Sequence, residues 1–229
     1  MQPGFYIAGM AGQMSQHKLD SVSHNLANVN TVGYVADRSA FSTMFPRQAA
    51  QIDTTKGDIK QTGDDLNFAI NGDAWFRIKT GEDQEAYTRA GNFRMDADGN
   101  LLTQGGRPVL DTGGSPIQLP PGHIVATDQG ELLINGAKTA TLGMVEIINN
   151  SEIERMGNSL IITPASNTTP AGNNISVRQG ELEGANVNSV ITTTELVNTM
   201  RSFQGMMKII EQYNQLSTLL SEQVGRVQG

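Results

Sequence analysis

One acidic segment of the chain has the spacing of a metal-binding loop. Asp96, Asp98 and Asn100 alternate as the first ligands of a calcium loop do. The glycine of this segment comes before Asn100 instead of after it, and Arg107 stands where such a loop closes with an acidic side chain. We therefore interpret the segment as the turn of a β-hairpin.

The three histidines are weak candidates for metal ligands. His17 and His24 lie seven residues apart, which is about 10 Å along a helix and too far for one metal ion. A surface or interface role is favoured for both. His123 follows two prolines and a glycine and is interpreted as a solvated loop residue.

Two pairs of adjacent carboxylates, Asp64-Asp65 and Glu82-Asp83, have the residue types that glycoside hydrolysis uses. Each pair lies in a turn-like polar stretch, and nothing around it indicates a cleft. The motifs of serine hydrolases, zinc proteases, phosphate-binding loops and dinucleotide-binding folds are absent from the sequence. We therefore predict no enzyme activity, and no catalytic, cofactor-binding or metal-binding residues.

Composition excludes several further classes. The 229 residues, 38% of them hydrophobic, suit one large domain or two small ones, and no apolar run has the length that a bilayer requires. A net charge of -7 without clustered Lys and Arg argues against nucleic acid, and the absence of cysteine excludes disulfides. The first residues lack the regions of a secretory signal peptide, so we expect a cytosolic protein or export without a cleaved signal.

Both ends of the chain carry apolar side chains at helical spacing. The N-terminal stripe is Ile7, Ala11, Met14, Leu19, Val22, Leu26 and Val29; the C-terminal stripe is Phe203, Met206, Ile210, Tyr213, Leu216, Leu220, Val224 and Val227. The C-terminal helix would be about 60 Å long, which is more than a small domain covers. We predict that residues 1–34 and 186–229 form a terminal helical domain, with the two helices paired as in a coiled coil.

The middle of the chain changes character at Asp58. Short alternating segments such as Leu66–Ile70 and Trp75–Ile78 are separated by turn formers such as Asn71-Gly72. We predict a central antiparallel all-β domain over residues 58–185, which includes a polar return segment, and hence an α+β fold. Residues 35–57 are predicted to be a connector, in which we favour packing of Phe41 and Phe45 on a neighbour.

Three stretches resemble the bacterial flagellar rod and hook proteins. Ser23–Tyr34 resembles the signature that ends their first helix, although His24 replaces its first asparagine. Ile70–Phe76, continued through Asp96–Leu101, resembles the shared β-domain motif, and Glu183–Asn188 opens the C-terminal helix as in the family. The motif positions carried over are Asn25, Leu26, Ala27, Asn28, Thr31, Gly33, Tyr34, Asn71, Gly72 and Phe76.

The resemblance implies a structural subunit of the flagellar basal-body rod. Such a subunit polymerises through its terminal helices, the D0-like domain, into a hollow drive shaft that transmits torque and passes exported subunits, with the D1-like β domain outside. Its implied partners are copies of itself, proximal and distal rod subunits and the flagellar type III export apparatus, without nucleic acid, cofactor or membrane insertion. Its implied location is the rod, which spans the periplasm. The expected assembly interface consists of Ile7, Met14, Val22, Leu26, Met200, Phe203, Met207, Ile210, Leu216 and Leu220.

Two alternatives remain at this point. The short connector and the run Phe203–Lys208 favour a proximal member of the family over a distal rod paralogue. A different class is a secreted carbohydrate-acting or adhesive β protein whose helices serve to oligomerise it. An exposed aromatic binding face or a paired-carboxylate cleft would distinguish that class, but only 5% of the residues are aromatic and Trp75 reads as strand core.

Overall fold

The computed structural model describes residues 3–38, 51–81, 84–172 and 174–227, and for 3–8, 51, 217 and 220–227 it describes the backbone alone. The chain divides into two compact units, Met1–Ala27 with Asn188–Gly229 and Asn28–Val187. We call them the helical unit and the β unit. Residues 39–50 of the predicted connector, with Phe41 and Phe45, lie outside the described residues, so their packing stays a prediction.

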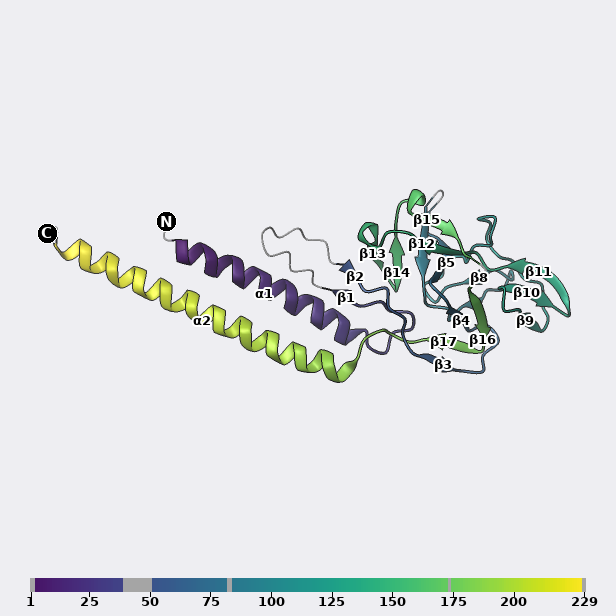
Figure 1. The fold of residues 1–229 in the computed structure, drawn as a ribbon, viewed down its shortest axis with the longest axis horizontal. Coiled ribbons are helices and arrows are strands. Elements are labelled where there is room, and N and C mark those ends of the chain that lie inside the picture. The colour runs from purple at the N-terminus through teal and green to yellow at the C-terminus, as the bar shows by residue number, and fades with distance from the viewer. Residues whose placement is uncertain (1–2, 39–50, 82–83, 173, 228–229) are drawn as a thin grey trace. The chain divides into compact units, whose positions relative to one another are not determined.

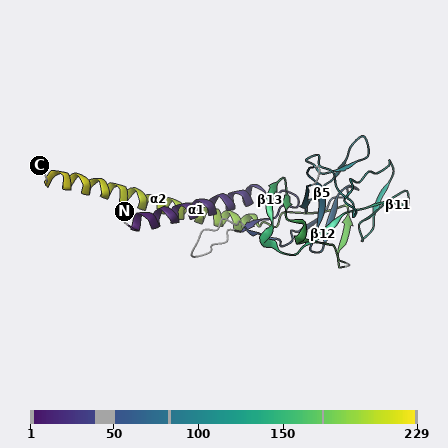
Figure 2. The same cartoon turned by 90° about the horizontal axis from the view of Figure 1, so that it is seen from above.

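The helical unit consists of α1, Pro3–Ala27, and α2, Ser189–Val227. Pro3 suits the first turn of α1, where its missing N–H has no helical partner in any case. Asn188 caps α2, because its side-chain oxygen accepts hydrogen bonds from the backbone N–H groups of Val190 and Ile191, both at 3.1 Å. The two helices run side by side in opposite directions, as both views show (Figures 1 and 2).

The predicted coiled-coil-like pairing of the helices is wrong. A coiled coil requires large apolar side chains at successive contact positions. In this unit the buried positions include Gly12, Thr192 and Thr199, which are too small to fill such a seam. Leu216, a member of the C-terminal stripe expected at the contact, is instead 58% exposed. The fold is α+β, with one helix from each end of the chain lying against the other without a continuous apolar seam.

The β unit is antiparallel in its strand pairs. Its largest sheet has the order β13-β14-β6-β5-β12-β15, formed by β5 Ala74–Lys79, β6 Glu85–Thr88, β12 Met144–Ile147, β13 Glu154–Gly157, β14 Leu160–Ile162 and β15 Thr168–Pro170. A three-stranded sheet contains β9 Ile124–Ala126, β10 Glu131–Ile134 and β11 Ala137–Thr141.

Among the described residues of the unit, four two-stranded pairs and two 3-10 turns accompany these sheets. The pairs are β1 Asp37–Arg38 with β2 Gln51–Ile52, β3 Ile59–Gln61 with β17 Glu181–Glu183, β4 Phe68–Asn71 with β16 Ser176–Gln179, and β7 Arg94–Met95 with β8 Leu101–Leu102. The turns are η1 Asn150–Glu152 and η2 Ala165–Asn167. Because β3 and β4 pair with β17 and β16, the unit is closed by strands from its own two ends.

Two apolar clusters lie on either side of β5. Successive side chains of a strand point to opposite faces, so Phe76 joins a cluster with Phe68 and Phe93, whereas Trp75 joins one with Tyr87. The rings of Phe76 and Phe93 meet edge to face at a centroid distance of 5.1 Å. Trp75 is 2% exposed, so the single tryptophan of the chain is a core residue of the β unit.

Candidate assembly interface

The helix α2 exposes apolar side chains on both sides of the row that faces α1. That row contains Phe203, Met206, Ile210 and Tyr213, all half-buried. At about 100° per residue, Met200 and Met207 lie on one flank of the row and Ile209 and Leu216 on the other. Each of these four side chains is between 45% and 58% exposed. Exposed apolar rows of this kind mark surfaces that a partner covers.

The contact between α1 and α2 is close at one point and polar at another. A Cβ at Gly12 would lie 3.7 Å from the Cδ1 atom of Ile210, an ordinary contact distance, so α1 packs beside Ile210 at this position. Lys18 forms an ion pair with Glu195 at 3.0 Å, with both side chains at least one-third exposed. A pair so exposed stabilises the contact by roughly 0–1 kcal/mol.

The ten residues of the expected interface have different environments. Val22 is 3% exposed, whereas Met14, Leu26, Phe203 and Ile210 are half-buried and Met200, Met207 and Leu216 are exposed. The side chains of Ile7 and Leu220 lie outside the described residues. The three exposed members, Met200, Met207 and Leu216, therefore have apolar surface available for contact with a partner subunit.

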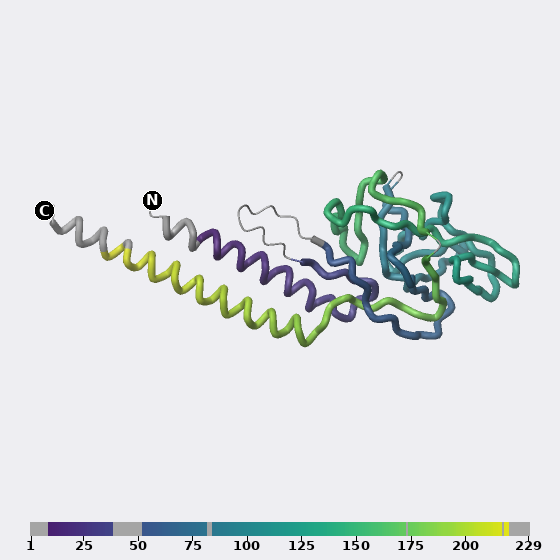
Figure 3. Tube along the Cα trace, viewed as in Figure 1, coloured from purple at the N-terminus to yellow at the C-terminus, as the bar shows by residue number. Residues whose placement is uncertain are grey.

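Within the β unit, the segment that follows α1 contacts the segment that precedes α2 (Figure 3). The backbone N–H of Gly33 donates a 2.8 Å hydrogen bond to the carbonyl oxygen of Glu183. Gly33 has φ of +60°, and a Cβ there would lie 2.1 Å from the backbone nitrogen of Ala90. Only glycine combines this conformation with so close an approach.

Asn186, in the segment that precedes α2, is hydrogen-bonded to the segment that follows α1 and to the end of the connector. Its backbone N–H donates to the Tyr34 oxygen at 3.2 Å, and its side-chain oxygen accepts from the Ala36 N–H at 2.6 Å. Its side-chain amide donates to the carbonyl oxygens of Asp53 at 2.6 Å and Thr55 at 2.9 Å. One side chain therefore joins three segments that are far apart in the sequence.

A buried ion pair lies beside these contacts. Arg89 Nη1 is 3.2 Å from Glu183 Oε2, and the side chains are 2% and 4% exposed. Nη1 also donates to the Gly72 carbonyl at 3.0 Å, and the guanidinium carbon lies 5.1 Å from the centroid of the Trp75 ring. Arg89, Glu183 and Asn186 lie in the family-like stretches or between them, but we did not select them as site residues. No local pattern marks Arg89 and Glu183 as partners, because 94 positions separate them.

The family-motif positions divide between the two units. Asn25, Leu26 and Ala27 form the last turn of α1, and the Thr31 hydroxyl donates to the Asn28 side chain at 3.1 Å just beyond it. Asn71 ends β4, the Gly72 carbonyl receives Arg89, and Phe76 is core.

Tyr34, the last position of the first motif, is 5% exposed beneath Arg155, whose guanidinium carbon lies 4.7 Å from the ring centroid. Burial and the nearby Asp37 carboxylate raise the pKa of Tyr34, and Arg155 opposes that change. Arg155 itself is held by Asp37 Oδ1 at 2.8 Å and by the Val35 carbonyl oxygen. The buried phenol is therefore favoured in its neutral form.

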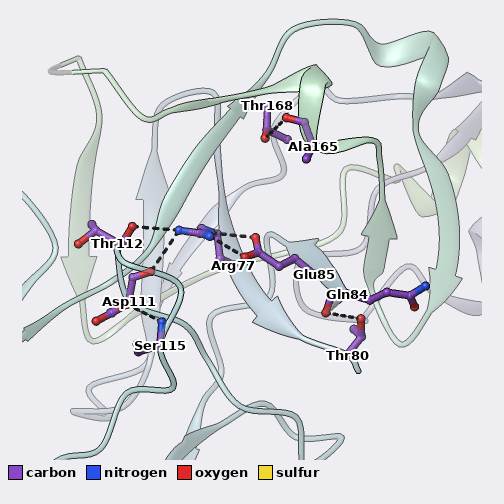
Figure 4. A network of polar contacts seen from close by, with 9 residues as sticks. All are labelled: Arg77, Thr80, Gln84, Glu85, Asp111, Thr112, Ser115, Ala165 and Thr168. Atoms are coloured by element: carbon purple, nitrogen blue, oxygen red, sulfur yellow. Dashed lines mark hydrogen bonds and ion pairs between the residues drawn. The ribbon is translucent and has the colours of Figure 1, made fainter. Parts of the chain in front are cut away.

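A polar network borders a hollow of the β unit that has a volume of about 900 Å³. Arg77 binds Glu85 through two hydrogen bonds of 3.0 and 2.6 Å and reaches the Thr112 carbonyl at 3.0 Å, as Figure 4 shows. The hydrogen bond to Glu85, more than the carboxylate charge, raises the pKa of Arg77, while partial burial opposes it. Both charges are thus engaged with each other, which suits a structural tie between β5 and β6.

The candidate chemical residues do not converge on a common centre. Asp96 accepts the backbone N–H groups of Asp98 at 3.0 Å and Asn100 at 2.8 Å, and it closes the β7–β8 turn as interpreted from the sequence. Its pKa is lowered, chiefly by the Asn100 side-chain amide.

The other candidates for metal binding or hydrolysis are scattered. Asp64 accepts a hydrogen bond from Asn67 at 3.4 Å, whereas Glu82 and Asp83 lie outside the described residues. His17, His24 and His123 are exposed. Among the described residues, no three His, Asp or Glu side chains are grouped so that they could hold a metal ion.

Neither α1 nor α2, over the residues that the structure describes, combines the length and the hydropathy needed to cross a bilayer.

Comparison with known proteins assigns these features to one family. Residues 69–140 match the model described as "Flagellar hook protein FlgE/F/G D1 domain", and residues 178–221 match "Flagellar basal body rod FlgEFG protein C-terminal". The chain is 33% identical to the flagellar basal-body rod protein FlgF of Mesorhizobium japonicum, with 93% of each chain covered. It is 34% identical to FlgF of Rhizobium meliloti over 92% of each chain, and 32% identical to FlgG of Bacillus subtilis over 89% of this chain and 92% of that one. The chain therefore belongs to the family of flagellar basal-body rod proteins, the structural subunits of the rod in the flagellar basal body.

Proposed function

We propose that this rod protein polymerises through the exposed flanks of α2, with neighbouring copies and other rod subunits covering them. The observation that carries the proposal is the pair of apolar flanks, Met200 with Met207 and Ile209 with Leu216, left exposed beside the contact with α1. Burying one such side chain contributes roughly 1.5–3 kcal/mol. Two flanks on opposite sides suit a subunit with a neighbour on each side, which is how open helical assemblies grow.

We further propose that the chain occupies an FlgF-like, proximal position and acts without catalysis. The FlgF relatives and the short connector support this position, although FlgG proteins match as well. A hollow rod would pass later subunits through its channel. The chain would itself be exported by the flagellar type III export apparatus before it joins copies of itself. The carbohydrate-binding alternative gains no support from Trp75, which is buried, as its interpretation as strand core implies.

A charge placed on one flank tests the proposal. Leu216 is 58% exposed, so Leu216→Asp leaves the single subunit unstrained but places a carboxylate in the expected contact. We expect an exported subunit with the wild-type melting temperature, and cells that lose rods and motility at least tenfold. The matched control is Gln215→Asp, which adds the same charge at an exposed polar position of α2 outside both flanks. Basal bodies counted by electron microscopy give the readout, and normal rods with Leu216→Asp would contradict the proposal.

A further inference from the structure

We propose that Arg89 and Glu183 are positioning residues for rod assembly, which rests on the assembly function proposed above. They hold together, inside the β unit, the two segments by which the chain leaves that unit for α1 and α2. We call the set Gly33, Gly57, Arg89 and Glu183 the crossing hub.

Glu183 connects three separate segments through different atoms. Its carbonyl oxygen accepts the Gly33 N–H at 2.8 Å, so it binds the segment that follows α1. Its carboxylate oxygen Oε1 accepts the Gly57 N–H at 3.0 Å, and Oε2 binds Arg89 at 3.2 Å. Because Glu183 ends β17, shortly before α2 begins, both chain crossings meet at this one residue.

Arg89 anchors the hub to the body of the sheet. Its guanidinium also donates to the Gly72 carbonyl, between β4 and β5, and lies over the Trp75 ring. Every buried side-chain nitrogen and oxygen among the described residues has a hydrogen-bond partner, so the pair is fully satisfied. The crossings are therefore tied to strands at the centre of the β unit and not to its surface.

Steric contacts leave the hub little freedom. A Cβ at Gly33 would lie 2.1 Å from the Ala90 nitrogen, and one at Gly57 would lie 2.1 Å from the Gly184 carbonyl oxygen. The segments thus pass in direct backbone contact, where a side chain would force them apart. Asn186, three residues after Glu183, adds further hydrogen bonds between the same segments.

Stability alone does not account for a buried ion pair. Replacing both partners with apolar side chains of similar volume is often neutral or stabilising, whereas removing one partner leaves an uncompensated charge. What the pair adds is a fixed geometry, because its two side chains join particular atoms of four segments, those of Gly57, Gly72, Arg89 and Glu183, and so hold the Glu183 backbone that binds Gly33. A subunit whose crossings are already fixed loses less conformational freedom when it joins a polymer, and this favours assembly.

The double variant Arg89→Met with Glu183→Leu separates positioning from stability. It removes both charges together, so we expect the β unit to melt within a few degrees of wild type while rods and motility fall at least tenfold. The matched control is Leu132→Ala, which opens a cavity at a fully buried position of β10 away from the hub. Leu132→Ala should lower the melting temperature and still assemble at temperatures where it is folded.

A distance measurement reads the positioning directly. Because the chain contains no cysteine, spin labels can be attached at Asn30→Cys and Val187→Cys alone, one on each crossing. We expect a narrow distance distribution in the otherwise wild-type chain and in Leu132→Ala, and a broad one in the double variant. The inference is overturned if the double variant builds at least as many rods as a Leu132→Ala chain whose melting temperature is equal or lower. A distance distribution that is not broadened in the double variant would also overturn it.

The two proposals fail in different ways. If Leu216→Asp abolishes rods and the double variant builds them normally, the positioning role is wrong and helix-mediated assembly stands. If Leu216→Asp builds normal rods, the assembly surface itself is wrong, whatever the double variant does.

Discussion

At the scale of single residues, Gly33 carries two constraints that can be measured apart. It needs a left-handed backbone, and it has no room for a methyl group against Ala90. Gly63 also has a positive φ, of +77°, but a Cβ there would meet nothing within 4 Å.

We therefore predict that Gly33→Ala destabilises the β unit more than Gly63→Ala. The left-handed conformation alone costs roughly 1–2 kcal/mol with alanine, and forcing apart packed backbone adds about 1–3 kcal/mol. Urea unfolding of both variants gives the comparison, in which Gly63→Ala pays only the first cost. Equal losses in the two variants would show that the contact with Ala90 relaxes freely.

Tyr34 predicts a limit to stability at alkaline pH. Burial, reinforced by Asp37, raises its pKa in the folded protein above the unfolded value of about 10. The stability that this shift contributes is fully present below the unfolded pKa, and it is lost as pH rises through the folded pKa. Tyr34→Phe should therefore weaken the fall of the melting temperature between about pH 9 and pH 11.

The buried Tyr87 is the internal control for that experiment. Its pKa is also raised by burial, so it should keep its own part of the alkaline dependence in Tyr34→Phe. Melting scans across the pH range, with tyrosinate absorbance as a second probe, measure both contributions. An unchanged alkaline slope would mean that Tyr34 ionises equally well in the folded and unfolded chain.

At the scale of elements, local patterns predicted the strands of the β unit well. Asn135-Gly136 has the composition of a hairpin turn, and it joins β10 to β11 with φ values of 53° and 85°, as a two-residue hairpin loop requires. Alternation along Trp75–Ile78 likewise placed neighbouring side chains on opposite faces of β5. Both signals depend only on residues adjacent in the sequence, which is why they are readable.

The helices show what such local patterns do not predict. Helical spacing identified the row Phe203, Met206, Ile210 and Tyr213 that is half-buried, but the next member of the stripe, Leu216, is exposed. Spacing predicts which side chains share a face, whereas the partner of that face depends on the size of residues elsewhere. Small residues such as Gly12 and Thr199 replaced the large ones that a coiled coil requires.

The crossing hub could not be predicted from the sequence for a related reason. Arg89 and Glu183 are ordinary charged residues in their own neighbourhoods, and only the tertiary fold of the β unit brings them together across 94 positions. The sequence signal that was available is indirect: Gly33 and Asn186 stand in the stretches that resemble the rod family. A glycine and an amide side chain where the chain enters and leaves a domain favour close backbone contact there.

At the scale of the whole molecule, the two units differ in what holds them together. The β unit has two buried clusters and the crossing hub. The helices contain Gly9 and Gly205, each of which costs about 1 kcal/mol relative to alanine, and a Cβ at either position would meet nothing within 4 Å. These glycines relieve no crowding within the subunit, so we expect helices that are marginal alone and firm in the polymer.

Limited proteolysis of the purified subunit tests this difference and the domain limits together. We predict that trypsin removes the helical segments, with early cleavage at Lys18 and Arg201, and leaves a folded core of the β unit. The sequence placed the start of the β domain at residue 58, but Gly33 and Asn186 are bonded inside the β unit. We therefore expect residues 28–36 to stay with the core on native size-exclusion chromatography, even after the chain is cut between them and residue 58. Mass spectrometry of the core fraction identifies them.

Loss of residues 28–36 from that fraction would return the boundary to residue 58, and full resistance of Lys18 and Arg201 would show that α1 and α2 are stable before the rod assembles.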